Sequence, residues 1–394
     1  MKKILFMVIN MNVGGTEKAL LNMVSAFPKD KFKITILMLE KHGDFLNYIP
    51  EGIRVEYVKG YKNIKHSIIE PLHSVVLGHF KKGNLIKASI VLLCYLSSKL
   101  MKERSLYYRY ILREFPVIQQ EYDIAVAYAG PMDFISYYVT NKIKAKKRIQ
   151  WIHFDVNKIG FNKFFAAKMY KKIDKIFVVS EEGKERLLKK LPSLINKTDV
   201  FSNVVSQELI EYQAEEGKGF RDTFDGIRIL TVGRLSYEKG QDLAIQALTK
   251  LIHNGYKVKW YCIGDGKSRV NYEKLITNSN VSDHFKLLGS DPNPYPYIKD
   301  CDIYVQPSRH EGYCITLAEA RCLNKPIITT DFTGANEQIK NGVTGLIVNC
   351  DANEIYKAIV NLINDPVLRN ELTSNLAGEN INTNNEVKKI VNMQ

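Results

Sequence analysis

The sequence alternates between strand-like and helix-like segments almost throughout, which restricts the chain to a parallel α/β architecture. Short apolar runs such as Lys3–Ile9 and Arg228–Val232 have the length and composition of buried strands. Amphipathic stretches such as Glu17–Phe27 and Leu243–His253 follow these runs with the period of helices. The alternation stops at Glu211–Gly219, which is rich in Glu, Gly and Lys, and then starts again. We therefore predict a linker there, with one doubly wound sheet on each side of it.

The length of the chain agrees with two domains, because a single core stops growing near ~250–300 residues and this chain has 394. We predict a Rossmann-like domain over residues 1–203 with a helical insert at 59–113. A second Rossmann-like domain is predicted over 204–375, and the last segment, 376–394, is expected to return as a helix to the first domain. Ligands bind beyond the carboxyl ends of the strands in such sheets. Two sheets facing each other across a cleft would therefore share one ligand.

Composition narrows the class of protein further. Hydrophobic residues make up 45% and charged residues 25% of the chain, which excludes a disordered chain, a fibrous protein and a disulfide scaffold. No two cysteines have C-x-x-C spacing, so neither a zinc pattern nor a redox motif is present. We expect the six cysteines to be small buried residues in a reducing compartment. The start of the chain turns polar at Asn10–Asn12, too early for a signal peptide, so we expect a cytoplasmic protein.

Positive charge is concentrated in the first half of the chain. Residues 1–200 carry 35 Lys and Arg against 18 Asp and Glu, whereas residues 201–394 carry 21 against 24. The densest basic stretch, 59–113, holds eleven Lys and Arg but only Glu70 and Glu103 as acids. It also contains the apolar run Ala88–Leu96, well short of the ~18 residues that a spanning helix needs. This combination suits a surface that lies on anionic lipid, at the inner face of the plasma membrane.

Two other interpretations of the basic stretch stay open. The same helices would serve equally as a solvated basic pair that only covers the core. Nucleic acid is the third option, and it is disfavoured because no recognised nucleic-acid-binding motif accompanies the charge.

A pair of glycines follows the first predicted strand. Gly14 and Gly15 allow the backbone to approach a ligand closely, and their amides lead into a helix N-terminus that suits an anion. The spacing is not G-x-G-x-x-G, so the fingerprint of a dinucleotide site is absent. A tight turn without any ligand explains the pair equally well.

Two cations follow the first predicted strand of the second half. Arg234 comes directly after Gly233, and Lys239 lies five residues further on. An arginine clamps two phosphate oxygens at once, and a lysine adds a point charge. The alternative for Lys239 is a solvated loop residue.

Two acids flank the loop that follows the predicted strand Ile303–Gln306. Glu311 falls in the loop, and Glu319 falls about one turn inside the next helix. The free amides near Cys314–Thr316 would lie at the positive end of that helix. A sugar diphosphate would use amides for phosphate and one carboxylate at either end for hydroxyls. Taken singly, Glu311 is also explained as an exposed loop acid, and Glu319 as a partner of the helix dipole.

Together these residues resemble a known family, the retaining, nucleotide-sugar-dependent glycosyltransferases of family 4, which have the two-Rossmann-domain GT-B fold. The match extends over nearly the whole chain and is most specific over 226–350. It rests on Arg234, Lys239 and the Glu311-x7-Glu319 pair, and on these further segments: Gly14-Gly15, Trp151-Ile152-His153-Phe154-Asp155, Val178-Val179-Ser180, Gly264-Asp265-Gly266, and Gly334-Ala335-Asn336-Glu337 with Gly342 and Gly345.

The resemblance implies a role for each matching position. Arg234 and Lys239 would neutralise the donor diphosphate, and Glu311 would hold hydroxyls of the transferred sugar. Glu319 would hold the ribose hydroxyls, and His153 would lie near the reacting sugar and the acceptor. The remaining donor-binding positions that the resemblance implies are Gly14, Gly15, Gly233, Gly312, Tyr313, Cys314, Ile315 and Thr316.

One of these positions departs from the family pattern, which usually has a small residue, often Gly, where Cys314 stands. Cysteine is small enough to keep the path to the amides open. As an alternative to a donor role, His153 is explained by a satisfied histidine at the end of a strand.

The leading prediction is an enzyme that moves a sugar from a nucleotide diphosphate donor, with UDP-sugar favoured, to a glycan acceptor. The basic insert extends it to a lipid-linked acceptor, as in capsule, exopolysaccharide or O-antigen assembly. No metal or other cofactor is expected, because two cations and the helix amides already supply fixed positive charge. The alternatives are a catalytically silent glycosyltransferase-like subunit that binds a partner, and an epimerase or phosphorylase of related fold. The sequence shows neither the acid/base groups nor the pyridoxal lysine that these last two need.

Overall fold

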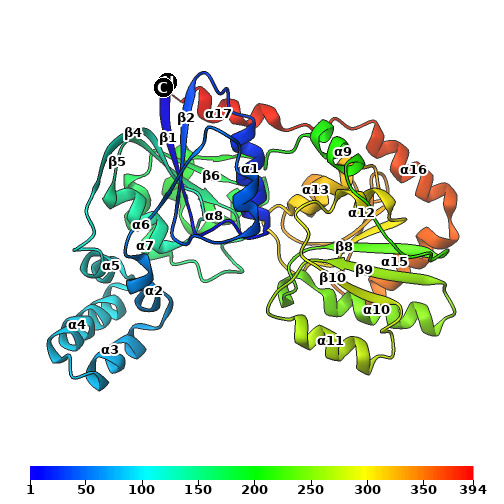
Figure 1. The fold of residues 1–394 in the computed structure, drawn as a ribbon, viewed down its shortest axis with the longest axis horizontal. Coiled ribbons are helices and arrows are strands. Elements are labelled where there is room, and N and C mark those ends of the chain that lie inside the picture. The colour runs from blue at the N-terminus through cyan, green and yellow to red at the C-terminus, as the bar shows by residue number, and fades with distance from the viewer. Residues whose placement is uncertain (394) are drawn as a thin grey trace. The chain divides into compact units, whose positions relative to one another are not determined.

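The computed structural model describes residues 1–393, which form two compact units (Figure 1). The first unit contains Met1–Asn12 and Phe27–Phe201, and the second contains Val13–Ala26 and the chain from Ser202 onward. Each unit holds one parallel sheet with helices, so the predicted α/β class with two doubly wound sheets is confirmed. The predicted domain limits at 203/204 and 375/376 stay a prediction.

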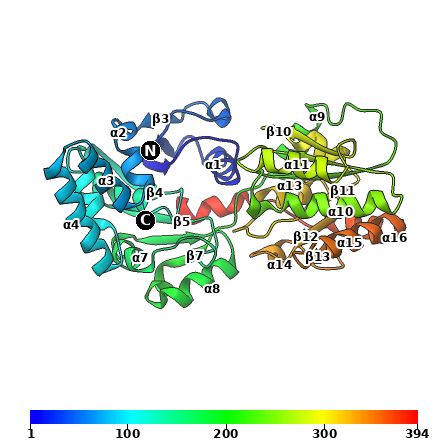
Figure 2. The ribbon, with the colours of Figure 1, turned by 90° about the horizontal axis from the view of Figure 1, so that it is seen from below.

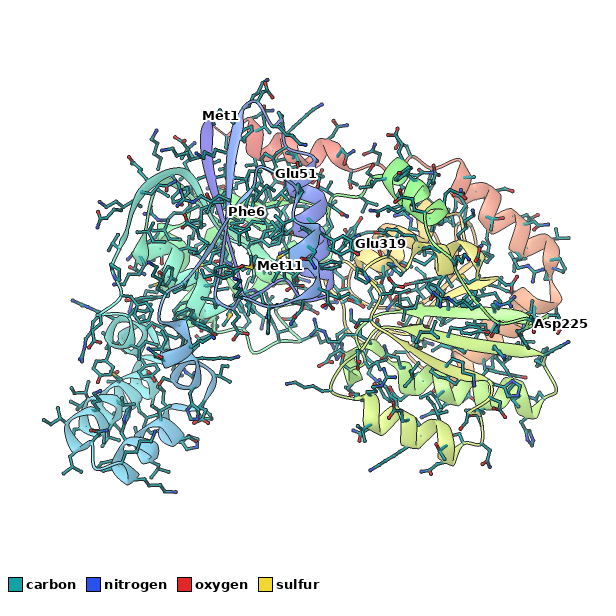
Figure 3. All side chains as sticks on the ribbon, viewed as in Figure 1. Met1, Phe6, Met11, Glu51, Asp225 and Glu319 are labelled. Atoms are coloured by element: carbon teal, nitrogen blue, oxygen red, sulfur yellow. The ribbon has the colours of Figure 1, made fainter. Side chains whose placement is uncertain are left out.

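The first sheet has the strand order β3-β2-β1-β4-β5-β6-β7, and every paired strand is parallel. Its middle strands are buried on both faces: Phe6 of β1, for example, is fully buried and contacts the ring of Tyr128 (Figure 3). The strands are β1 (Lys2–Val8), β2 (Phe32–Met38), β3 (Arg54–Tyr57), β4 (Ile118–Ala127), β5 (Ile143–Ile152), β6 (Lys175–Val178) and β7 (Thr198–Val200). The helices that follow β4 to β6 are α6 (Asp133–Lys142), α7 (Lys163–Met169) and α8 (Glu181–Lys190), and the 3-10 segments are η1 (Asp44–Tyr48), η2 (Tyr170–Lys172) and η3 (Pro192–Lys197).

Four helices lie between β3 and β4 in the region of the predicted basic insert. They are α2 (Tyr61–Ile69), α3 (Leu72–Lys81), α4 (Leu85–Met101) and α5 (Ser105–Ile111). Figures 1 and 2 show them as a blue-to-cyan group at one edge of the first unit, with α3 and α4 side by side. Tyr108 of α5 joins the core, where its ring contacts Phe134 and Phe165 at centroid distances of 5.8 and 5.9 Å. Among residues 1–393, no helix is long and apolar enough to cross a bilayer.

The second sheet has the strand order β10-β9-β8-β11-β12-β13 and is also parallel. Trp260 of β9 is fully buried, and its indole nitrogen donates to Thr231 Oγ1 of β8 at 3.0 Å. The strands are β8 (Ile227–Val232), β9 (Val258–Ile263), β10 (Phe285–Gly289), β11 (Ile303–Gln306), β12 (Ile327–Thr330) and β13 (Leu346–Val348). The helices of this unit are α1 (Gly15–Ser25), α9 (Gln207–Glu215), α10 (Gln241–His253), α11 (Arg269–Asn278), α12 (Tyr295–Asp300), α13 (Ile315–Cys322), α14 (Ala335–Gln338), α15 (Ala352–Asn364), α16 (Pro366–Ala377) and α17 (Lys388–Val391), with 3-10 segments η4 (Tyr237–Lys239) and η5 (Asn384–Val387).

The strand order predicts a ligand crevice between β8 and β11. The chain runs outward from β8 to β9 and β10 on one side, and from β11 to β12 and β13 on the other. Loops that leave these two neighbouring strands therefore turn to opposite faces of the sheet and leave a gap at the carboxyl edge. The loops that contain Arg234 and Glu311 leave the sheet at this point.

One local prediction is wrong, and one helix was not predicted. Glu211–Gly219 is not wholly a linker, because α9 extends to Glu215; the Ser206 hydroxyl caps this helix, and Ile210 and Ala214 are buried on one of its faces. The helix α16 was missed, although it has clear start signals. Asp365 accepts a hydrogen bond from the amide of Leu368 at 2.9 Å, and Pro366 occupies the first helical position.

Candidate active site

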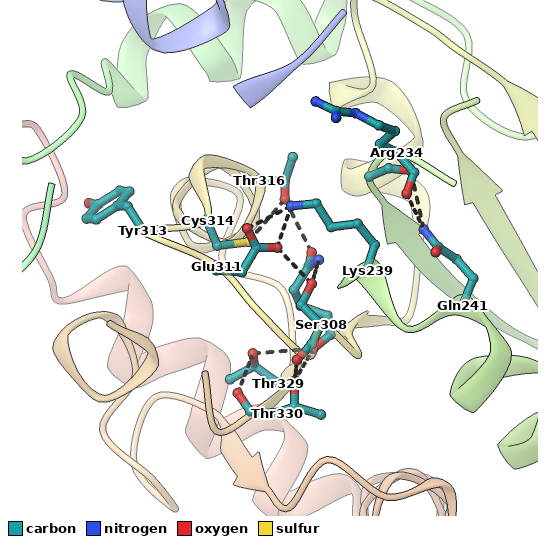
Figure 4. Close-up of polar contacts among 12 residues, drawn as sticks. Arg234, Lys239, Gln241, Ser308, Glu311, Tyr313, Cys314, Thr316, Thr329 and Thr330 are labelled. Atoms are coloured by element: carbon teal, nitrogen blue, oxygen red, sulfur yellow. Dashed lines mark hydrogen bonds and ion pairs between the residues drawn. The ribbon is translucent and has the colours of Figure 1, made fainter. Parts of the chain in front are cut away.

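The loops after β8 and β11 are joined by one ion pair. Lys239 Nζ lies 2.6 Å from Oε1 and 2.7 Å from Oε2 of Glu311 (Figure 4). The hydroxyl of Ser308 donates to Glu311 Oε1 at 2.7 Å. Only 8% of the Glu311 side chain and 26% of the Lys239 side chain are exposed. Lys239 is therefore not a freely solvated loop residue, and Glu311 is not an exposed loop acid.

This ion pair keeps Lys239 charged. Burial by itself would lower the pKa of Lys239, but the negative charge of Glu311 outweighs it and raises the pKa above its usual range. An ammonium group has three N–H donors, and two of them point to Glu311. One donor thus stays available for a further anion at the carboxyl edge of the sheet.

Arg234 lies near this pair but has no protein partner. Its guanidinium makes no hydrogen bond or ion pair with any of residues 1–393, and the residue is exposed. Its backbone is held by Gln241, whose amide donates to the Arg234 carbonyl oxygen at 3.0 Å (Figure 4). The second unit therefore presents a cation that forms no hydrogen bond or ion pair on a fixed section of backbone, with the carboxylates of Glu17 and Glu238 within range of its charge.

The glycine pair is brought to the same place. A Cβ atom on Gly14 would lie 3.7 Å from Arg234 Nη2, and one on Gly15 would lie 3.5 Å from Cγ2 of Ile315. Glu17, in the first turn of α1, is close enough for the charge of Arg234 to act on it, although burial is the larger effect and raises the pKa of Glu17. The structure thus brings together candidate site residues that lie far apart in the sequence: Gly14, Gly15, Arg234 and the start of α13.

The start of α13 contains a strained residue. Cys314, the N-cap, has φ +66°, in the left-handed region that costs a residue with a Cβ atom about 1–2 kcal/mol. Its thiol lies 3.4 Å from Thr316 Oγ1, and burial raises the thiol pKa, so the group is uncharged. Gln338 donates to the carbonyl oxygens of Tyr313 and Cys314 and holds this turn. The hydrogen bonds from Gln338 therefore hold Cys314 in a backbone conformation that glycine would adopt more easily.

Glu319 is more buried than the other charged candidates of the second unit, Arg234, Lys239 and Glu311. It is 2% exposed and accepts a hydrogen bond of 2.8 Å from the hydroxyl of Tyr295. Lys18 of α1 is the nearby cation, and its ammonium lies 5.0 Å from the centre of the Tyr295 ring. Burial raises the pKa of Glu319, while the charge of Lys18 and the Tyr295 hydroxyl act in the opposite direction. The ribose role of Glu319 and the alternative of a helix-dipole partner both stay predictions.

A polar network beneath the ion pair was not predicted. Gln306, the last residue of β11, donates to Ser308 Oγ at 2.8 Å and accepts from Thr316 Oγ1 at 3.2 Å. Thr330, at the end of β12, donates to the carbonyl oxygen of Ser308 at 2.5 Å (Figure 4). The signal was present in the sequence, because buried strands rarely end in polar residues unless these face a site. Lys18 and Tyr295 had no comparable signal.

His153 lies in the first unit, directly after β5. It is 6% exposed, and its ring centre is 4.6 Å from that of Tyr128 and 6.1 Å from that of Trp151. Burial lowers its pKa to about 3, so the imidazole is neutral at physiological pH. Within the described chain its Nε2 atom has no hydrogen-bond partner. Its predicted place near the reacting sugar stays a prediction.

The buried imidazole should make the protein sensitive to acid. The folded pKa lies below the ordinary value of 6.5, so the unfolded chain binds more protons and stability falls as the pH drops through 6.5. We expect wild type to lose about 2 kcal/mol more stability than His153→Gln between pH 7.5 and pH 5.0. Urea unfolding at both pH values measures this difference, with the exposed His73→Gln as the matched control. Equal losses in wild type and His153→Gln would contradict the prediction.

A metal ion would need a group of side chains that could hold it. No group of three or more His, Cys, Asp or Glu side chains able to hold a metal ion is found among residues 1–393. Asp300 and Asp302 have the Asp-x-Asp spacing of some metal sites, but they precede β11, at the opposite end of the strand from Glu311. There Asp302 accepts a hydrogen bond of 2.7 Å from the amide of Arg228. Independence from metal stays a prediction.

Comparison with known proteins agrees with this geometry. Residues 221–377 match the family model described as glycosyl transferases group 1. An uncharacterised glycosyltransferase of Methanocaldococcus jannaschii is 32% identical over 43% of this chain and 42% of its own length. A second relative comes from Campylobacter jejuni and is named N-acetylgalactosamine-N,N'-diacetylbacillosaminyl-diphospho-undecaprenol 4-alpha-N-acetylgalactosaminyltransferase. It is 30% identical over 53% of this chain and 56% of its own length. The chain thus spans about half the length of these relatives.

Solved structures match over the full length. The structure of Anabaena HepE in complex with UDP-glucose has a TM-score of 0.70 at 17% identity and covers 99% of this chain and 98% of its own. The TarM variant from Staphylococcus aureus, in complex with UDP among other ligands, has a TM-score of 0.71 at 16% identity and covers 100% and 99%. These similarities confirm the GT-B fold class.

Proposed function

We propose that this protein transfers a sugar from a nucleotide diphosphate donor, with a UDP-sugar favoured, to a lipid-linked glycan acceptor in cell-surface polysaccharide synthesis. The reaction proceeds with retention of anomeric configuration and without a metal ion. The family match and the relatives' names support a glycosyltransferase. CapM of Staphylococcus aureus, a capsular polysaccharide biosynthesis glycosyltransferase, is 28% identical over 63% of this chain and 68% of its own length.

One observation carries the proposal. At the crevice between β8 and β11, an unpaired guanidinium and a partly paired ammonium stand beside a buried carboxylate. When the bond between sugar and diphosphate breaks, negative charge grows on the leaving nucleotide. Fixed cations that stabilise this charge lower the barrier without reorganising solvent. Arg234 and the third N–H of Lys239 are suited to that role, and Glu311 is suited to accept hydroxyls of the sugar.

The acceptor and the donor nucleotide are taken from the relatives. The Campylobacter jejuni relative acts on a diphospho-undecaprenol carrier by its name, which supports a lipid-linked acceptor here. The HepE and TarM structures contain UDP or UDP-glucose, which supports UDP over GDP. Retention is implied by the resemblance of the Glu311-x7-Glu319 pair to family 4.

Nucleotide binding tests the proposal first. We expect UDP to raise the melting temperature, since a ligand at 100 times its Kd adds about 2.7 kcal/mol to stability, and GDP to raise it far less. We then expect slow release of UDP from UDP-sugars, unchanged by EDTA, with a product of retained configuration by NMR. Failure of every nucleotide to raise the melting temperature would contradict the proposal. Binding without any turnover on a lipid-linked or soluble glycan would instead indicate a silent subunit.

A further inference from the structure

Helix α4 is apolar on two opposite sides, and only one of them is covered. Ala88 and Val91 are buried and face the core of the first unit. The outer side carries Leu85, Ile86, Leu92, Leu93, Leu96 and Leu100, which fall within an arc of about 120° at 100° per residue. Five of these six are at least 53% exposed, with Leu100 at 86%. The exposed Ser89 lies within the same arc, so the outer side is apolar except at this position.

The neighbouring helix α3 extends this exposed surface. Leu77 is 57% and Phe80 is 43% exposed, and α3 packs along α4 (Figure 1). Single exposed leucines are common on proteins, but a cluster of exposed apolar side chains along a helix pair marks an interaction site. We call the outer side chains of these two helices the α3–α4 face.

Uncompensated positive charge surrounds the α3–α4 face. From Pro71 to Lys102 the chain contains no Asp or Glu. The acids at its two ends are already engaged: Glu70 lies 3.0 Å from His66 Nε2, and buried Glu103 pairs with Lys168 at 2.8 Å. The lysines of the segment form no ion pair with any acid of residues 1–393; these are Lys81, Lys82, Lys87, Lys99 and Lys102.

We propose that the α3–α4 face docks on an anionic lipid bilayer, with α4 lying in the plane of the membrane surface. Exposed aliphatic side chains bracketed by lysines have the composition of helices that lie in the interface. Each lysine near such a surface strengthens binding about fivefold. The inference rests on the proposed function only in that a lipid-linked acceptor would be reached from the same surface.

A second copy of the chain fits this face less well. A twofold interface places the same patch on both partners, so it would bring the lysines of one copy against those of the other. Like charges at close range oppose association. A nucleic acid would leave the leucines without a partner, since base stacking uses aromatic side chains.

Binding to vesicles tests the proposal. In a flotation experiment, we expect the full chain to bind vesicles of phosphatidylcholine and phosphatidylglycerol at roughly 7:3 and to be released by about 0.5 M salt. We expect no binding to vesicles of pure phosphatidylcholine. Lys81→Ala with Lys82→Ala should weaken binding about 25-fold. Leu93→Ser with Leu96→Ser should weaken it at least tenfold. Both pairs lie on exposed positions, so their melting temperatures should match that of wild type.

Matched controls separate this surface from general charge. Lys29→Ala with Lys31→Ala removes two exposed lysines elsewhere in the first unit, and Ile195→Ser removes an exposed aliphatic side chain; both should bind within twofold of wild type. No vesicle binding by wild type, equal loss in the controls, or a dimer that Leu93→Ser with Leu96→Ser dissociates would overturn the proposal. UDP-induced stabilisation without vesicles should be unchanged in every variant, so failure of membrane docking and failure of the proposed function are seen separately.

Discussion

Replacing Arg234 with alanine should lower kcat/KM for the sugar donor by about 10²–10³-fold and leave folding almost untouched. The guanidinium has no hydrogen bond or ion pair within residues 1–393, so its removal breaks neither kind of bond in the folded state. Surface substitutions of this kind change the free energy of unfolding by no more than about 0.5 kcal/mol. We therefore expect the loss of activity to be much larger than the loss of stability, because the guanidinium of Arg234 is free to bind an anion.

Steady-state kinetics and urea unfolding on the same preparations check this result. Arg234→Lys should recover part of the activity, since a lysine keeps the charge but loses the two-pronged geometry. Arg221→Ala, an exposed arginine of the same unit, is the matched control and should behave as wild type. An Arg234→Ala variant with wild-type kcat/KM would remove the diphosphate role from this residue.

The second large effect is expected at Glu311. Glu311→Ala leaves the Lys239 ammonium and the Ser308 hydroxyl without their partner in a place that is mostly shielded from water. Removing one partner of a buried ion pair costs about 3 kcal/mol of stability, so we expect this variant to be less stable than wild type. We also expect its activity to fall by about 10²-fold. Loss of both properties alone does not distinguish a structural from a catalytic role.

A double substitution makes that distinction. Lys239→Met with Glu311→Leu replaces the ion pair by apolar side chains of similar size, and such replacements are often neutral or stabilising. We expect urea unfolding to show recovered stability relative to Glu311→Ala. Activity should stay at or below that of the single variant, because the charge and the hydroxyl acceptor are both gone. Recovery of stability and turnover together would assign the pair to folding alone.

Much of the fold follows from local sequence patterns. The strand Ile303–Gln306 was predicted with its observed bounds, and Lys3–Ile9 and Arg228–Val232 lie within one residue of β1 and β8, because buried parallel strands are short apolar runs with polar ends. The prediction of a linker at Glu211–Gly219 was wrong because it also relied on local composition. Its polar residues read as a loop, whereas Ser206 and the buried Ile210 and Ala214 stabilise a helix across its first part.

The candidate site was predicted in part. Arg234, Lys239 and Glu311 were recognisable because each follows a predicted strand, and strand ends of a parallel sheet share one edge. The partners of Glu319 could not be recognised from the sequence. Lys18 and Tyr295 are distant from it in the chain and come close to it only because α1 and α12 pack against α13. The left-handed backbone at Cys314 was equally hidden, since cysteine carries no preference for positive φ.

By itself, then, the amino-acid order determined which segments become strands and helices, where the chemically active side chains leave the sheet, and how unevenly charge is distributed. These are properties of neighbouring residues, and hydrophobic periodicity reports them directly. Only the tertiary structure decided that Lys239 is held by Glu311 while Arg234 is left unpaired, and that α4 turns a second apolar side outward. Such facts depend on which elements pack together, and packing is set by the whole core rather than by any local stretch of it.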